Sequence, residues 1–112
     1  MKCFIKLSDV AGIQENGHLS YDMLNETNGC VAGCCAGISI YPETEYPDGD
    51  LHDNQEGFFI LEGFGWAKVG EQEFSIEPEV SFIVPAGIRH CIRKGPSSKP
   101  VKAFWFHSAI GQ

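Results

Sequence analysis

Short apolar segments separated by turn-forming residues run through most of this chain. The predicted strands span residues 30–41, 57–62, 66–69, 73–76, 80–84, 88–94 and 101–107. In the first of these segments every even position is apolar, which is the period-2 pattern of a strand. Glycine and proline stand between the segments, as in Pro85-Ala86-Gly87. Strands that recur about every 8–12 residues predict an all-β sandwich or barrel and exclude a fold of alternating strands and helices.

The size and charge of the chain limit its class and its partners. Its 112 residues fit one domain, spanning residues 1–112 with a strand-rich core at about 29–107. No apolar run approaches the roughly 20 residues of a membrane-spanning helix, and the first residues lack the apolar core of a signal peptide. The formal charge of −7 repels phosphate backbones. We therefore expect a cytoplasmic protein that binds neither a membrane nor nucleic acid.

Three of the five cysteines lie close together in the sequence, at Cys30, Cys34 and Cys35. On an extended strand Cys30 and Cys34 would be about 13 Å apart, too far to share one ion. An odd number of cysteines without a signal peptide argues against a disulfide framework. We therefore interpret the cluster as small buried residues of a strand.

A set of histidines and carboxylates has the spacing of a metal site. Asp50 and His52 are two residues apart, so on a strand they face the same way about 6.6 Å apart. The turn-forming residues 53–55 allow a reversal that would place Glu56 across from His52. Gly63 then permits the tight turn that ends the strand after Glu56.

A second histidine motif follows about thirty residues later. Pro85-Ala86-Gly87 predicts a sharp corner, and His90 lies on the strand that leaves it. The predicted metal ligands are Asp50, His52, Glu56 and His90. Two imidazoles and two carboxylates suit one divalent transition metal such as Fe, Mn, Ni, Co or Zn. Asp50 alone fits a surface residue at a strand end equally well, whereas the other three form the stronger set.

Residues of the same strand parity as the ligands are the candidate walls of a small-molecule pocket. The expected pocket residues are Tyr41, Phe58, Ile60, Ile88, Ile92, Trp105 and His107. Tyr41 and Trp105 suit stacking on a ligand, although aromatic residues in a small barrel more often belong to the core. His107 is either an acid–base group beside the metal or a surface histidine at a strand end, and we favour the surface position. A largely apolar pocket of this kind favours a small organic ligand with one or two oxygens that reach the metal.

The two motifs resemble those of the cupin superfamily. His52, Glu56 and Gly63 fall in register with the pattern His-x-His-x3–4-Glu-x6-Gly, and Pro85, Gly87 and His90 with Pro-x-Gly-x2-His-x3-Asn. Three departures are Asp50 in place of the first histidine, Thr44 in place of a glycine and Lys94 in place of the asparagine. The resemblance covers about residues 29–107. It implies a double-stranded β-helix (jelly-roll) barrel, commonly a homodimer, with the metal and ligand inside the barrel mouth.

A fold of this kind does not fix the function. The superfamily that the chain resembles includes dioxygenases, isomerases, decarboxylases and lyases, and also storage proteins and sensors. One hypothesis is a metal-dependent enzyme acting on a small organic metabolite, with Glu56 or Asp50 moving a proton. The alternative is a non-catalytic module that binds a metal or a metabolite. We favour the enzyme.

Overall fold

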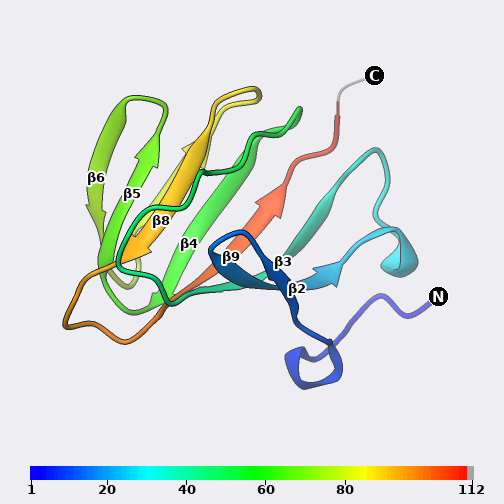
Figure 1. Cartoon of the computed structure of the whole chain (residues 1–112). Helices are drawn as coiled ribbons and strands as arrows, with labels where there is room; N and C mark the ends of the chain where they lie inside the picture. The colour runs from blue at the N-terminus through cyan, green and yellow to red at the C-terminus, as the bar shows by residue number, and fades with distance from the viewer. Residues whose placement is uncertain (111–112) are drawn as a thin grey trace.

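Two antiparallel β-sheets packed face to face form the protein (Figure 1). The computed structural model describes residues 1–110. One sheet contains, in spatial order, β1 (Ile13–Glu15), β2 (His18–Leu24), β3 (Cys35–Tyr41), β9 (Val101–His107), β4 (Glu56–Glu62) and β7 (Ser81–Val84). The other contains β6 (Gln72–Ile76), β5 (Gly65–Val69) and β8 (His90–Lys94). Two short 3-10 helices, η1 (Leu7–Asp9) and η2 (Glu26–Asn28), lie before β3.

The expected all-β class is confirmed, but the expected closed barrel is not found among the described residues. The strands form two separate sheets because β7 pairs only with β4 and β6 pairs only with β5. The segment between β3 and β4 is joined to β8 by an isolated bridge between Asp50 and His90 and by a backbone hydrogen bond from Lys94 to Glu43. The architecture is therefore a β-sandwich that is open at its edges.

Alternation along β9 decides which side chains face the interior. Val101 and Ala103 are fully buried and Trp105 is nearly so, whereas Phe104 and Phe106 remain about two-fifths exposed on the outside. The core between the sheets consists of Tyr41, Phe58, Ile60, Ala67, Ile76, Val84, Ile92, Val101, Ala103 and Trp105. Burying one side chain of the size of Ile60 contributes about 1.5–3 kcal/mol. The inner face of β9 therefore forms a central part of the hydrophobic core.

The predicted strands agree with the observed ones within about two residues, except for the first. Strand β3 begins at Cys35 and not at Cys30. A turn precedes it, in which Cys34 donates a backbone hydrogen bond to Val31 and Gly33 has a positive φ of 85°. The turn brings the Cys30 and Cys34 thiols into hydrogen-bonding contact. The prediction of an extended, buried segment was therefore wrong for Cys30 and for Cys34, which is exposed, whereas Cys35 begins β3 and packs partly buried against the core.

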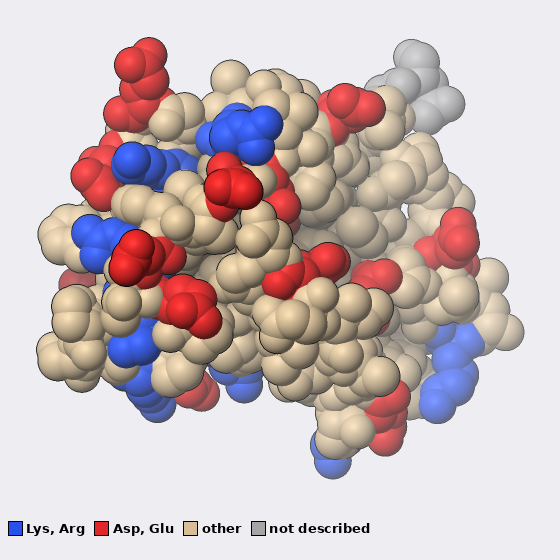
Figure 2. Space-filling view, viewed as in Figure 1, with Lys and Arg blue, Asp and Glu red and all other residues tan. Residues whose placement is uncertain are grey.

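Acidic side chains dominate part of the surface. Figure 2 shows a hollow on the face that is turned to the viewer, with Asp and Glu side chains beside it and Lys and Arg farther away.

Within residues 1–110 no helix is long and apolar enough to cross a membrane.

Candidate metal centre and cavity

Backbone hydrogen bonds hold the two sequence motifs side by side. Asp50 and His90 exchange two such bonds, of 2.9 and 3.0 Å, and the Gly87 N–H donates to the His52 carbonyl at 2.8 Å. The corner after β7 is formed by a bond from Ile88 N–H to the Pro85 carbonyl. Gly87 has a φ of 77°, which favours glycine at this corner. Residues 50–52 therefore run antiparallel to residues 87–90, and His52 and His90 reach the same place.

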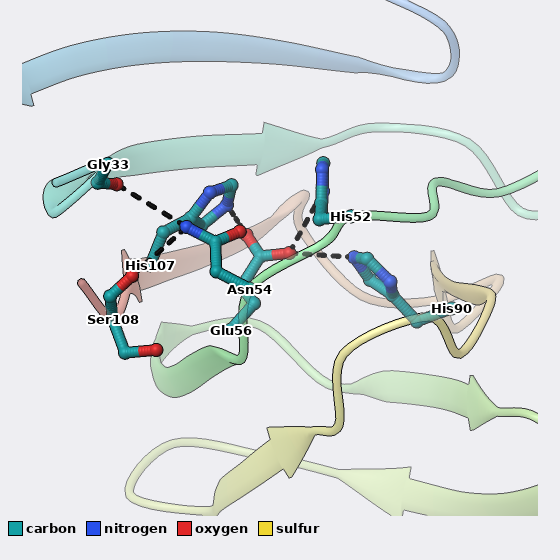
Figure 3. Close-up of polar contacts among 7 residues, drawn as sticks. All are labelled: Gly33, His52, Asn54, Glu56, His90, His107 and Ser108. Carbon is teal, nitrogen blue, oxygen red and sulfur yellow. Dashed lines mark hydrogen bonds and ion pairs between the residues drawn. The ribbon is translucent and has the colours of Figure 1, made fainter. Parts of the chain in front are cut away.

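His52, Glu56 and His90 converge there, as the sequence predicts (Figure 3). Each offers one ligand atom, and the three atoms lie within 4.8 Å of one another. Oε1 of Glu56 is 2.9 Å from Nε2 of His90 and 3.3 Å from Nε2 of His52. Glu56 and His90 are buried, and His52 is about one-third exposed. The group therefore has one open side.

His107 also belongs to this site, so the surface position that we favoured was wrong. Its Nε2 lies 3.0 Å from Oε2 of Glu56. The cause is the strand register, because β4 pairs with β9 and places Glu56 directly opposite His107. Both side chains point to the interior of the sandwich (Figure 3).

The surroundings of Glu56 favour its charged form. Burial alone would raise the pKa of this carboxyl, but the close contacts and Coulomb attraction of His107 and His90 outweigh burial and lower the pKa to about 2. Burial lowers the pKa of His52, and repulsion from His107 and His90 lowers it further. An ionised carboxylate and a neutral imidazole are the forms that bind metal ions.

An unsatisfied oxygen shows that these residues fit a metal ion. Oε1 of Glu56 is buried and has no well-directed hydrogen bond from any residue of the described part of the chain, although two imidazole nitrogens lie within 3.3 Å of it. A buried carboxylate oxygen without a partner is costly. A divalent cation bound between this oxygen and the two nitrogens would satisfy all three atoms, and their N2O donor set suits Fe, Mn, Co, Ni or Zn.

Asp50 lies at the edge of this group. Its side chain lines the same cavity, but its oxygens are not among the three ligand atoms that lie within 4.8 Å of one another. Its backbone bonds to His90 fix its position beside the second histidine. A role for Asp50 as a metal ligand or as a proton carrier therefore stays a prediction.

A cavity of about 240 Å³ opens beside the ligand group. Of the expected pocket residues, Tyr41, Trp105 and His107 line it. Phe58, Ile60 and Ile92 instead belong to the buried core, and Ile88 lies in the turn before β8 with 36% of its surface exposed. Strand parity identified the inner face correctly, but only the end of each strand that is nearest to the mouth reaches the cavity. The lining is consequently more polar than the sequence suggested.

Asn54 fixes the loop that leads to Glu56. Its side-chain amide donates to the carbonyls of Ser108, at 3.0 Å, and of Gly33, at 3.4 Å (Figure 3). The backbone of Ser108 in turn donates to the Gln55 carbonyl. Sequence reasoning placed Asn54 only in a turn, because nothing in the sequence shows that the segments after β9 and before β3 approach this loop.

The family model described as Cupin domain matches residues 38–107, which contain both motifs and β9. The chain belongs to the cupin family. No curated protein matches its sequence significantly.

Solved structures of other proteins share this fold. The cupin domain of Schizosaccharomyces pombe Cnp3 is 21% identical, with a TM-score of 0.75 over 94% of this chain and 68% of that one. A predicted oxalate decarboxylase from Thermotoga maritima is 11% identical, with a TM-score of 0.79 over 95% and 98% of the two chains. Hydroxypropylphosphonic acid epoxidase from S. wedmorenis, in complex with fosfomycin, is 12% identical, with a TM-score of 0.76 over 94% of this chain and 58% of that one. At these identities the likeness concerns the fold alone.

Proposed function

We propose that this cupin binds one divalent transition metal through His52, Glu56 and His90 and acts as a metal-dependent enzyme on a small organic metabolite. Asp50 is the proposed fourth ligand or a proton carrier beside the ion. The observation that carries the proposal is the buried, unsatisfied Oε1 of Glu56 between two imidazole nitrogens at the side of an open cavity.

The proposed chemistry divides between the ion and the side chains around it. When bound, the ion acts as a Lewis acid that polarises an oxygen of the ligand. Oε1 of Glu56 would be the oxygen that holds the ion, and Oε2 lies 3.0 Å from Nε2 of His107. His107 is therefore placed to hold or move a proton at its Nε2, beside Oε2 of Glu56. Turnover additionally requires a coordination position that the protein leaves open.

Cobalt(II) titration of the metal-free protein tests both parts of the proposal. We expect visible d–d absorption that saturates at about one equivalent and is lost in His52→Ala/His90→Ala. His18→Ala is the matched control, because His18 lines the same cavity outside the ligand group and its loss should leave cobalt binding intact. Absence of binding by the wild-type chain would refute the metal site.

Azide added to the cobalt form then tests for the open position. A spectral change supports the enzyme, because an exogenous ligand has entered the coordination shell. No change means that protein ligands fill the shell, which would sink the enzyme hypothesis and leave a metal-binding or sensing module.

We also propose that two copies of the chain associate through the outer face of the six-stranded sheet. Four large apolar side chains are exposed on neighbouring strands of this face: Phe59, Ile83, Phe104 and Phe106. The register places Phe59 opposite Phe104. A contiguous apolar surface of this kind is typical of an interface.

Sedimentation velocity tests this dimer. The wild-type chain should sediment as a dimer that Phe104→Glu dissociates, whereas Ile13→Glu, on the edge strand β1, should leave the dimer intact. A monomeric wild-type chain would refute the dimer.

A further inference from the structure

The cavity has a second polar group of residues, on strands remote from the metal ligands. His18 on β2 and Ser39 and Tyr41 on β3 line it, and β9 separates these strands from β4, which carries Glu56. All three are at least nine-tenths buried. Burying polar groups is costly unless they are hydrogen-bonded, so their position in a cavity wall needs a reason.

The contacts within this group define which hydrogen bonds it still offers. Nδ1 of His18 lies 3.3 Å from the Asn16 carbonyl, which can only accept, so in the neutral ring Nδ1 carries the proton and Nε2 is an acceptor. The ring of His18 packs against that of Tyr41 with 5.0 Å between the centroids. The Ser39 hydroxyl lies close to the Tyr41 phenol, and burial raises the pKa of Tyr41, so its O–H group stays protonated. Tyr41 therefore offers a donor beside the acceptor of His18.

A hydroxyl group matches this donor and acceptor pair. It accepts from the Tyr41 O–H and donates to Nε2 of His18, whereas a carboxylate can only accept. Between this pair and the metal ligands lies Trp105 on β9, whose buried Nε1 has no acceptor among the described residues. Within residues 1–110 the protein therefore leaves Nε1 of Trp105 unsatisfied between the two groups, and Oε1 of Glu56 unsatisfied among the metal ligands.

The charges of the lining oppose an anionic ligand. Glu15, Asp50 and Glu56 line the cavity, and none of its lining residues is Lys or Arg. A divalent ion would offset two of the three negative charges, which leaves no surplus of positive charge for a second anionic group. Such an arrangement discriminates against anions by leaving their charge unpaired. The volume of about 240 Å³ is also below the range of drug-sized pockets.

We infer that Tyr41 and His18 bind a hydroxyl group of a small, uncharged, hydroxyl-rich molecule. The other oxygens of this molecule reach the proposed metal site. The ligand class is thus a short polyol or sugar-like compound and not a dicarboxylate or a phosphate ester. This inference rests on the proposed metal site for one end of the ligand, while the hydroxyl-binding end depends only on residues of β2 and β3.

Three four-carbon probes of increasing charge test the inference: erythritol, threonate and tartrate. Their affinities for the zinc-loaded protein are measured by calorimetry and by ligand-observed NMR. We expect erythritol to bind at least about tenfold more tightly than tartrate, with threonate between them. Tyr41→Phe, which removes only the hydroxyl, should weaken erythritol binding about 3- to 10-fold, as expected for one net hydrogen bond. His18→Phe, which keeps a ring but removes both nitrogens, should weaken it similarly.

Tyr21→Phe is the matched control, because Tyr21 lies opposite Ile38 on the outer face of the sheet and should leave affinity unchanged. Zinc affinity is measured for every variant and should not change. Tightest binding of tartrate, no binding of erythritol, or equal affinity in wild type, Tyr41→Phe and His18→Phe would each overturn the inference. If the wild-type chain binds none of zinc, iron, manganese, cobalt and nickel, the proposed function fails, and the response of erythritol binding to Tyr41→Phe in metal-free protein still decides the hydroxyl site.

Discussion

Replacing Glu56 by Gln removes a charge that the fold stabilises, while it nearly preserves the volume of the side chain. Burial opposes the charge, but contacts with His107 and His90 outweigh burial and lower the pKa of Glu56 from 4.5 to about 2. Because one pKa unit corresponds to about 1.4 kcal/mol, the ionised carboxylate contributes about 3 kcal/mol to the stability of the metal-free protein. The folded-state pKa is the lower one, so this contribution is complete above about pH 4.5 and is lost as the pH falls towards 2.

Urea unfolding of metal-free protein between pH 7 and pH 3 measures this contribution. The difference in unfolding free energy between wild type and Glu56→Gln should shrink by about 2 kcal/mol by pH 3. Glu62→Gln serves as the control, because Glu62 is half exposed and its ion pair with Lys99 at 3.2 Å lies at the surface. The difference in unfolding free energy between wild type and Glu62→Gln should stay nearly constant with pH. A Glu56→Gln difference that is equally flat with pH would refute the electrostatic account of the site.

Two further substitutions test the scaffold around the site. Asn54→Ala removes the hydrogen bonds to the Gly33 and Ser108 carbonyls and should lower the unfolding free energy by about 1–2 kcal/mol in urea titrations; an unchanged value would mean that the loop is held in another way. Gly63→Ala should cost about 1–3 kcal/mol by thermal unfolding, because φ is 81° and the new Cβ would lie 2.7 Å from the Pro100 carbonyl oxygen. A melting temperature equal to that of wild type would contradict the close packing of this turn.

Most of the fold follows from local sequence patterns. Alternation and turn residues predicted the strand at 101–107 with the observed bounds of β9. The spacing of His52 and Glu56 and the corner before His90 predicted a convergent ligand group, because short turns determine how such neighbours approach. Local patterns cannot predict whether the edge strands of two sheets pair with each other. The resemblance implied a closed barrel, but the strands form two separate sheets.

The residues that the sequence did not reveal depend on pairing between distant strands. His107 reaches Glu56 only because β9 lies beside β4 in a register that no local pattern specifies. His18 and Ser39 line the cavity because β2 and β3 pair with Ser20 opposite Ser39. Strand parity places His107 on the same face of β9 as the buried Trp105. This was the one sign in the sequence that His107 points inward.

The metal content of freshly purified protein tests the central claim most directly. Inductively coupled plasma mass spectrometry should find close to one equivalent of a divalent transition metal in the wild-type chain and almost none in His52→Ala/His90→Ala. The element found would also direct the search for a reaction, since iron favours O2 chemistry and zinc favours Lewis-acid chemistry. Protein that contains no metal, and that takes up none when iron, manganese, cobalt, nickel and zinc are supplied, would contradict the account.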